Sequence, residues 1–132
     1  MRPHDPLSPH RLKELLLVRD ADWRAWPPRL PDQPIFYPVT TCAYAEKIAR
    51  DWNSVTPAPD NLGFVTRFEI TDDLAAKYPV QDVGGHDHQE LWIPAEDLDA
   101  LNAGILGTID PVAAYRDKAP MDLAEAARLW GA

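Results

Sequence analysis

The chain has 132 residues, of which 45% are hydrophobic and 26% charged, a composition typical of one globular domain and not of a disordered segment. Its 13 basic and 21 acidic residues give a net charge of −8, which argues against a general binder of nucleic-acid backbones. The single cysteine excludes an intramolecular disulfide, and we find no apolar run long enough for a signal peptide or a membrane span. We therefore expect a cytoplasmic protein that is a monomer or a small homo-oligomer.

The N-terminal part is predicted to contain a tail and a helix. Residues 1–7, with their prolines, are expected to be flexible. Ser8 followed by Pro9 is typical of an N-cap and a first-turn proline, so we predict a helix that begins there and runs to about Asp20. Its buried face is predicted to carry Leu12, Leu15 and Leu16.

A short strand followed by a helix is predicted over residues 31–53. Ile35-Phe36-Tyr37 is an apolar and aromatic run that Pro38 ends, and Thr40 or Thr41 can cap the helix that follows. The apolar face of this helix is predicted to consist of Ala45, Ile48, Ala49 and Trp52.

The remaining chain alternates irregularly between predicted strands and helices. In order, we expect a half-buried strand over 62–70, a short helix capped by Thr71 over 71–78, an edge strand over 79–83, a strand over 88–93, a helix over 94–104 and a strand over 105–109. The C-terminal accessory segment, 112–132, is expected to carry a terminal helix over Met121–Trp130. The predicted fold is α+β: one domain over residues 1–132, with a largely antiparallel, split β-sheet and flanking helices.

Two groups of residues suggest nucleophilic or metal chemistry. Cys42 lies at the start of a predicted helix, where the helix dipole would lower its pKa, and a Cys-His hydrolase can be drawn with His86 or His88 as the base. A lone cysteine is more commonly a small buried residue. In an extended chain His86, His88 and Glu90 would point to one side, as a metal site requires, but histidines after Gly84-Gly85 are more commonly exposed turn residues, so we predict no metal.

Glu90 is the most informative acidic residue. It lies within a predicted strand that is otherwise apolar, next to Leu91 and Trp92. One interpretation is the solvent-exposed side of an alternating strand. The other is a carboxylate held at a cleft, where it can stabilise the positive charge that develops on a sugar carbon.

A family resemblance connects these segments. Residues 23–53 read WRAWPPRLPDQPIFYPVTTCAYAEKIARDWN, followed by GFVTRFEI at 63–70 and ELWIPAEDLDALNAGILGTI at 90–109. Over about residues 13–109 the chain resembles a family of small bacterial proteins labelled "ADP-ribosylation/crystallin J1". It more distantly resembles the ADP-ribosyltransferase fold, in which an aromatic strand precedes a helix and a later strand carries a catalytic Glu.

The resemblance implies a site and a reaction. It makes Tyr37 a candidate to stack on nicotinamide and Glu90 the residue that contacts the nicotinamide ribose, so that nicotinamide is displaced from NAD⁺. Phe36, Arg29 and Arg67 are the further candidates to bind the nucleotide. The acceptor is expected to be a second molecule, such as a protein.

The first strand of the resembled fold carries an Arg or His that holds the cofactor. Here residues 7–9 read Leu-Ser-Pro, so His10, Arg11 and Arg2 are the candidates for that role. Two other functions remain open: a non-catalytic binding or interaction domain of the same fold, and the metal- or Cys-His-dependent hydrolase described above.

Overall fold

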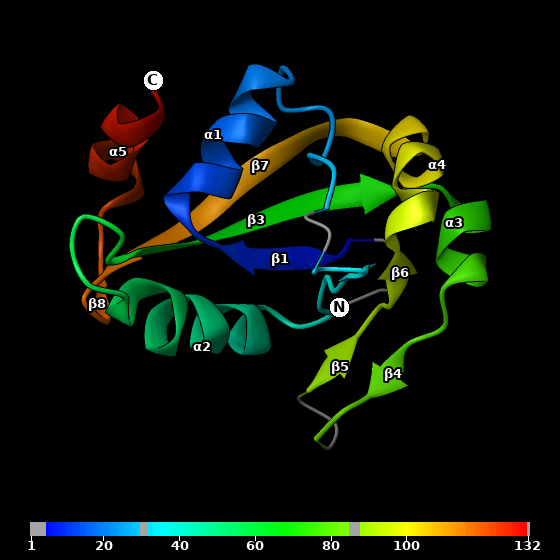
Figure 1. Cartoon of the computed structure of the whole chain (residues 1–132), viewed down its shortest axis with the longest axis horizontal. Coiled ribbons are helices and arrows are strands. Elements are labelled where there is room, and N and C mark those ends of the chain that lie inside the picture. Colours follow the sequence, from blue (N-terminus) through cyan, green and yellow to red (C-terminus); the bar gives the residue numbers. More distant parts are fainter. Residues whose placement is uncertain (1–4, 30–31, 85–87, 132) are drawn as a thin grey trace.

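The computed structural model describes residues 5–29, 32–84 and 88–131, and it is a mixed α and β structure with antiparallel sheets (Figure 1). Its four-stranded sheet has the order β1-β3-β7-β8, formed by Leu7–His10, Leu62–Ile70, Ile105–Arg116 and Ala119–Pro120. Two further pairs are β2 with β6, formed by Ile35–Phe36 and Ile93–Pro94, and β4 with β5, formed by Gln81–Asp82 and Gln89–Glu90. The predicted α+β class is confirmed.

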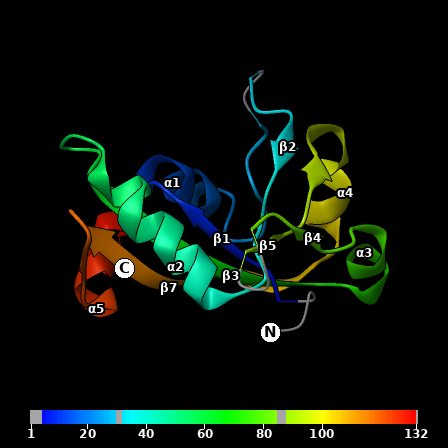
Figure 2. The same ribbon diagram turned by 90° about the horizontal axis from the view of Figure 1, so that it is seen from below.

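Five α-helices are present in the described residues. They are α1 (Leu12–Asp20), α2 (Cys42–Asp51), α3 (Asp72–Lys77), α4 (Leu98–Ala103) and α5 (Leu123–Ala126). The helices α1, α2 and α5 lie towards one end of the molecule, whereas α3, α4 and the short strands β4 and β5 lie towards the other (Figures 1 and 2). None of the described helices has the length and apolar character needed to cross a membrane.

The helices α1 and α2 cover opposite faces of β3. Leu15 of α1 packs in one cluster with Phe64, whereas Ala45 and Ala49 of α2 pack in another with Val65. Because neighbouring residues of a strand point to opposite faces, these contacts place the two helices on the two sides of the sheet. The central strand is therefore covered on both faces in its first half, and not half-buried throughout as its alternation predicts.

The prediction for residues 7–11 is wrong. Leu7 is not part of a tail but a buried residue of β1, and α1 begins only at Leu12, with Arg11 as an N-cap that makes no side-chain capping bond. Pairing with β3 along the whole of β1 outweighs the local N-cap signal of the Ser-Pro pair. Pro9 is tolerated in β1 because its backbone nitrogen faces away from β3. The amide of Leu7, two residues earlier and therefore on the same edge of the strand, donates to Val39 and not to β3, so no donor towards β3 is needed at position 9.

Residues 112–116, within the segment assigned to a C-terminal accessory helix, are strand, whereas the terminal helix predicted over Met121–Trp130 is present from Leu123. The strand β7 continues to Arg116, and the register between β3 and β7 shifts between Val65 and Thr66, which allows Pro111 within a paired strand. The terminal helix begins at Leu123 and is continued by a 3₁₀ segment, Ala127–Trp130. Its last residue is buried against Phe64, so this segment belongs to the core.

The predicted strand over 88–93 consists of two strands that pair with different partners. Gln89–Glu90 pairs with β4, whereas Ile93–Pro94 pairs with β2. Between them Leu91 is fully buried and its amide donates to the carbonyl of Pro38 at 2.8 Å. The chain thus crosses from one small sheet to the other at this point.

Candidate functional site

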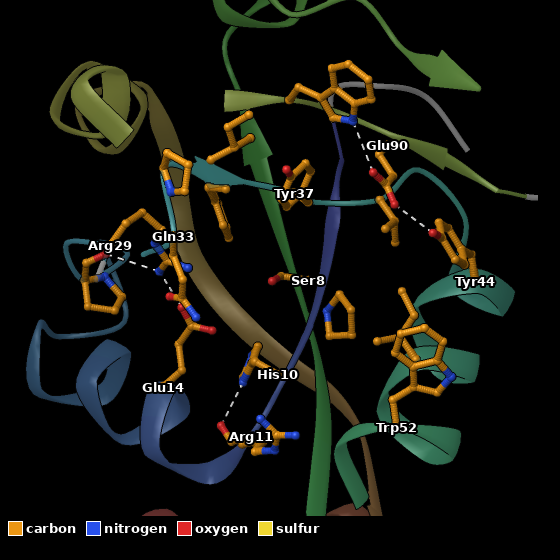
Figure 3. A pocket seen from close by; sticks show the side chains of 18 of the residues that line it. Ser8, His10, Arg11, Glu14, Arg29, Gln33, Tyr37, Tyr44, Trp52 and Glu90 are labelled. Carbon is orange, nitrogen blue, oxygen red and sulfur yellow. Dashed lines mark hydrogen bonds and ion pairs between the residues drawn. The ribbon is translucent and has the colours of Figure 1, made fainter. Parts of the chain in front are cut away.

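A cleft of about 1120 Å³ lies beside β1, between α1 and α2 (Figure 3). Its base is formed by Ser8, Pro9 and His10 of β1, and its other walls come from the segment 27–37, from β5 and from Trp92. Every part of the cleft therefore comes from elements in the first 92 residues, although β3 and β7 support it from behind.

The cleft forms because the sheet divides at β1. Val39 forms bridges to Leu7 on one side and to Glu90 on the other, and it thereby joins β5 to the main sheet at one point. Beyond Leu7 the outer edge of β1 has no recorded strand partner among the described residues, and Pro9 on that edge offers no amide for pairing. The space beside this edge of β1 is enclosed by α1 and α2.

The Glu90 carboxylate is held in the cleft by two neutral donors. Tyr44 of α2 donates its hydroxyl to Oε2 at 2.7 Å, and Trp92 donates its indole N–H to Oε1 at 3.1 Å (Figure 3). No Lys or Arg of the described residues is recorded as an ion-pair partner of Glu90. Each oxygen keeps one lone-pair direction for a further donor, so the carboxylate is fixed in position and still able to bind a ligand.

Burial, the hydrogen bond to Glu90 and the charge of Glu90 together raise the pKa of Tyr44 to about 12. Tyr44 thus remains a neutral donor over the physiological pH range. The ring of His88 packs on the ring of Tyr44, with 4.7 Å between centroids.

Tyr37 lines the same cleft as Glu90, whereas Phe36 is mainly a core residue. The side chain of Tyr37 is 48% exposed and lies at the Glu90 end of the cleft (Figure 3). Phe36 is 3% exposed and packs against Trp26 and Phe68, so only a small part of its ring borders the cleft. Of the two, Tyr37 is the one available for stacking on a ligand.

The two arginines singled out from the sequence have different surroundings. Arg29 lines the cleft, where it pairs with Glu14 and lies over the ring of Phe36, with its side chain nine-tenths buried. Its Nε has no hydrogen-bond partner among the described residues. Arg67 is exposed on β3, beside Leu7 in the β1–β3 register, and is not among the residues that line the cleft.

His10 lies on the first strand and borders the cleft, but its ring is 3% exposed. Burial, the largest effect, lowers its pKa, so the ring is neutral near pH 7. Nδ1 then donates to the carbonyl of Arg11 at 3.2 Å, and Nε2 accepts from the Thr66 hydroxyl at 3.1 Å. His10 thus supplies no charge to the cleft, while Arg2 lies outside the described residues.

The cleft is less acidic than the chain as a whole. Among its lining residues, Arg11, Lys13, Arg29 and Lys47 are basic and Glu14, Asp32 and Glu90 are acidic. With the histidines neutral, 4 − 3 gives a formal charge of +1, against −8 for the whole chain. An anionic ligand group is therefore accommodated better here than on the average surface.

Cys42 does not have the properties predicted from its place at the start of α2. Its pKa is raised, not lowered, because of desolvation by burial first, and then because of the charge of Glu46 and the hydrogen bond to it. The thiol is exposed, donates to Glu46 Oε1 at 3.6 Å and is not among the residues that line the cleft. The thiolate required for a Cys-His hydrolase is thus disfavoured at this position.

The described residues contain no group of three or more His, Cys, Asp or Glu side chains placed to hold a metal ion. His86, which we considered as a base or a ligand, lies outside the described residues. His88 borders the cleft, and its Nδ1 contacts the carbonyl of Gly84 at 3.0 Å.

The sequence interpretation did not identify Tyr44 or Trp92 as functional residues. Tyr44 is 46 positions from the carboxylate that it contacts, so no local pattern marks it. Trp92 lies two positions after Glu90, on the same side of an extended chain, and that spacing was a usable signal.

In comparisons with known proteins, no family model matches this chain, and no match is found among the curated proteins or the solved structures.

Proposed function

We propose that the cleft binds NAD⁺ and that the protein is an ADP-ribosyltransferase-like enzyme. The observation that carries this proposal is that Tyr37 and Glu90, chosen from the sequence for this chemistry, line one cleft. Had the two side chains lain on opposite sides of the sheet, the proposal would have been untenable.

The charges in the cleft fit the two ends of a dinucleotide. Glu90 and Tyr37 lie at one end, where a cationic nicotinamide ring would find a carboxylate and an aromatic face (Figure 3). Arg11 lies at the opposite end in the same view, and Lys13 and Lys47 also line the cleft, so they provide positive charge for a pyrophosphate. Arg67 does not line the cleft, and Phe36, which is 3% exposed, contributes little surface to it.

In the proposed reaction, the bond between ribose C1′ and the nicotinamide nitrogen breaks, and its electron pair leaves with neutral nicotinamide. The ribose then carries positive charge, which the Glu90 carboxylate stabilises. A nucleophilic oxygen or nitrogen of the acceptor forms the new bond at C1′ and loses its proton. Because Tyr44 and Trp92 are neutral donors, they fix the carboxylate without cancelling its negative charge.

The experiment is to incubate the purified protein with NAD⁺ and to follow nicotinamide release, with Glu90→Gln as the comparison. We expect release from the wild-type protein and a loss of about 10²-fold or more in the variant, as for removal of a group that stabilises transition-state charge. Equal release from both proteins would exclude a role for Glu90. An absence of both release and NAD⁺ binding by calorimetry would exclude the function.

A binding domain without turnover is the second candidate. It is favoured by His10, because the neutral, buried ring on the first strand uses both nitrogens within the protein. If this candidate is correct, calorimetry detects NAD⁺ or ADP-ribose binding, while no nicotinamide is released even in the presence of candidate protein acceptors.

A further inference from the structure

The end of the cleft around Glu90 is rich in aromatic side chains. Tyr37 is 48% exposed and Trp92 is 43% exposed, and both line the cleft together with Tyr44. Figure 3 shows Tyr37 and Tyr44 on either side of the Glu90 side chain, while the indole of Trp92 contacts its other oxygen. Three aromatic side chains thus gather around a single carboxylate.

Within the described parts of the chain, the Glu90 carboxylate has hydrogen bonds but no cationic partner. Both of its recorded partners, the Tyr44 hydroxyl and the Trp92 indole N–H, are neutral donors, and no ion pair to Glu90 is recorded within the described residues. Removal of a carboxylate from water is costly unless an opposite charge compensates it. Glu90 is only half-buried, but the surrounding rings exclude part of its water, so a cation there would be stabilised by its charge.

The chemistry of the site selects one kind of cation. A carboxylate beside exposed aromatic faces binds organic cations whose charge is spread over an apolar surface, because the rings attract positive charge and also favour apolar contact. A compact ammonium or metal ion is poorly matched, since such ions retain water and prefer several oxygen ligands.

We propose that Glu90, Tyr37, Tyr44 and Trp92 form a recognition site for organic cations of the N-alkylpyridinium or quaternary ammonium class. The proposal agrees with NAD⁺ as a ligand but does not require that the protein turns NAD⁺ over. It further states that the site discriminates by charge: a cationic ring binds, and a neutral ring of nearly the same shape binds much more weakly.

The test compares 1-methylnicotinamide, which is a permanent cation, with neutral nicotinamide. Both are titrated into the full chain while the indole N–H signals are followed by NMR, and the Trp92 signal is assigned from its loss in Trp92→Phe. We expect the cation to bind about tenfold or more tightly than the neutral ring and to shift the Trp92 signal.

Three variants show which group provides the discrimination. Glu90→Gln keeps the size of the side chain, and we expect it to reduce the ratio of the two affinities to about threefold or less. Tyr37→Leu, at an exposed position, should weaken the cation by about threefold to tenfold. Asp32→Asn is the matched control, because it removes an acidic charge from the same cleft, and it should leave the ratio unchanged.

Three outcomes would overturn the proposal. They are equal affinity for the two compounds, a shift of other indole signals while that of Trp92 stays in place, and an equal effect of Asp32→Asn and Glu90→Gln on the affinity ratio. No detectable binding of 1-methylnicotinamide would overturn it as well. If the cation binds selectively but NAD⁺ releases no nicotinamide, the site is confirmed and the enzymatic function fails. If NAD⁺ releases nicotinamide but the protein does not prefer the cation, the enzymatic function is confirmed and the proposed cation site fails.

Discussion

At the scale of single residues, the site depends on how Glu90 is held. The hydroxyl of Tyr44 and the indole of Trp92 each take one carboxylate oxygen, so the side chain keeps one orientation. Tyr78 provides an internal comparison. It donates to Asp97 at 2.8 Å, and partial burial together with that carboxylate raises its pKa to about 12 as well, at a distant place in the core.

This comparison gives a prediction for the ionisation of Tyr44. In Glu90→Gln the hydrogen bond to a charged acceptor and the carboxylate charge are lost, whereas the desolvation remains. The pKa of Tyr44 should therefore fall from about 12 but stay above its ordinary value of 10, and that of Tyr78 should not change. Tyrosine ring carbons followed by NMR through alkaline pH measure both values.

The raised pKa values of Tyr44 and Tyr78 also predict how the stability of the fold changes at alkaline pH. A pKa that is higher in the folded than in the unfolded protein stabilises the fold fully below about pH 10 and progressively less as pH rises towards about 12. If the pKa of Tyr44 is the same in the wild-type protein and in Glu90→Gln, the hydrogen bond that fixes the carboxylate is absent.

At the scale of elements, the cleft is positioned by the packing of α2 on β3. A Cβ atom added to Gly63 would fall on the carbonyl of Ala49, so the backbones of the two elements are in direct contact. Ala45 and Ala49 are fully buried at this contact, because only small side chains fit there. Trp52, at the C-terminal end of α2, is 70% exposed, contrary to its predicted burial.

We predict that Gly63→Ala destabilises the protein by about 2–3 kcal/mol, because the backbone must move apart to admit the methyl group. Gly107→Ala is the control: it adds the same methyl group in open space, at φ +72°, and should cost about 1 kcal/mol from backbone strain alone. Urea denaturation measures both changes. A cost for Gly63→Ala no larger than that of Gly107→Ala would contradict the close packing.

Trp52 and Trp26 should respond very differently to truncation. Trp52→Ala is expected to change the free energy of unfolding by no more than about 0.5 kcal/mol, because the side chain is on the surface. Trp26→Ala, in the centre of the core cluster, should cost about 3–5 kcal/mol. Thermal or urea denaturation of the two variants decides this, and a similar loss from both would mean that Trp52 is packed in solution.

Elements determined by local sequence were predictable, and those determined by distant pairing were not. Leu62–Ile70 alternates clearly, and Thr71 caps α3 through the amide of Leu74, so both elements have the predicted positions. The strand β1 was not predicted, because Ser8-Pro9 has a local helix-start signal and its pairing partners lie more than 50 residues away. For the same reason Glu90 could be selected from the sequence, whereas its partner on α2 could not.

At the scale of the whole molecule, the distribution of charge separates the cleft from the rest of the surface. The chain carries −8, yet the residues that line the cleft sum to +1. An anionic ligand group is therefore accommodated better in this cleft than on the average surface of the protein.

Lys13→Ala and Lys47→Ala should therefore each weaken the binding of ADP-ribose, by about threefold to tenfold, because each removes a positive charge from the cleft. Lys77→Ala is the control, since Lys77 lies on α3, 3.6 Å from Asp97, and does not line the cleft. Calorimetry at low and high salt should also show weaker binding at high salt. Equal effects of the three variants, or no dependence on salt, would contradict binding of the pyrophosphate in the cleft.

The most direct test of the account is a crystal structure of the Glu90→Gln variant with NAD⁺. We predict that the nicotinamide ring stacks on Tyr37, that its ribose hydroxyls bond the residue 90 side chain, and that the pyrophosphate lies near Lys13 and Lys47. A dinucleotide bound outside the cleft, or one whose nicotinamide lies at the end away from Tyr37, would contradict it.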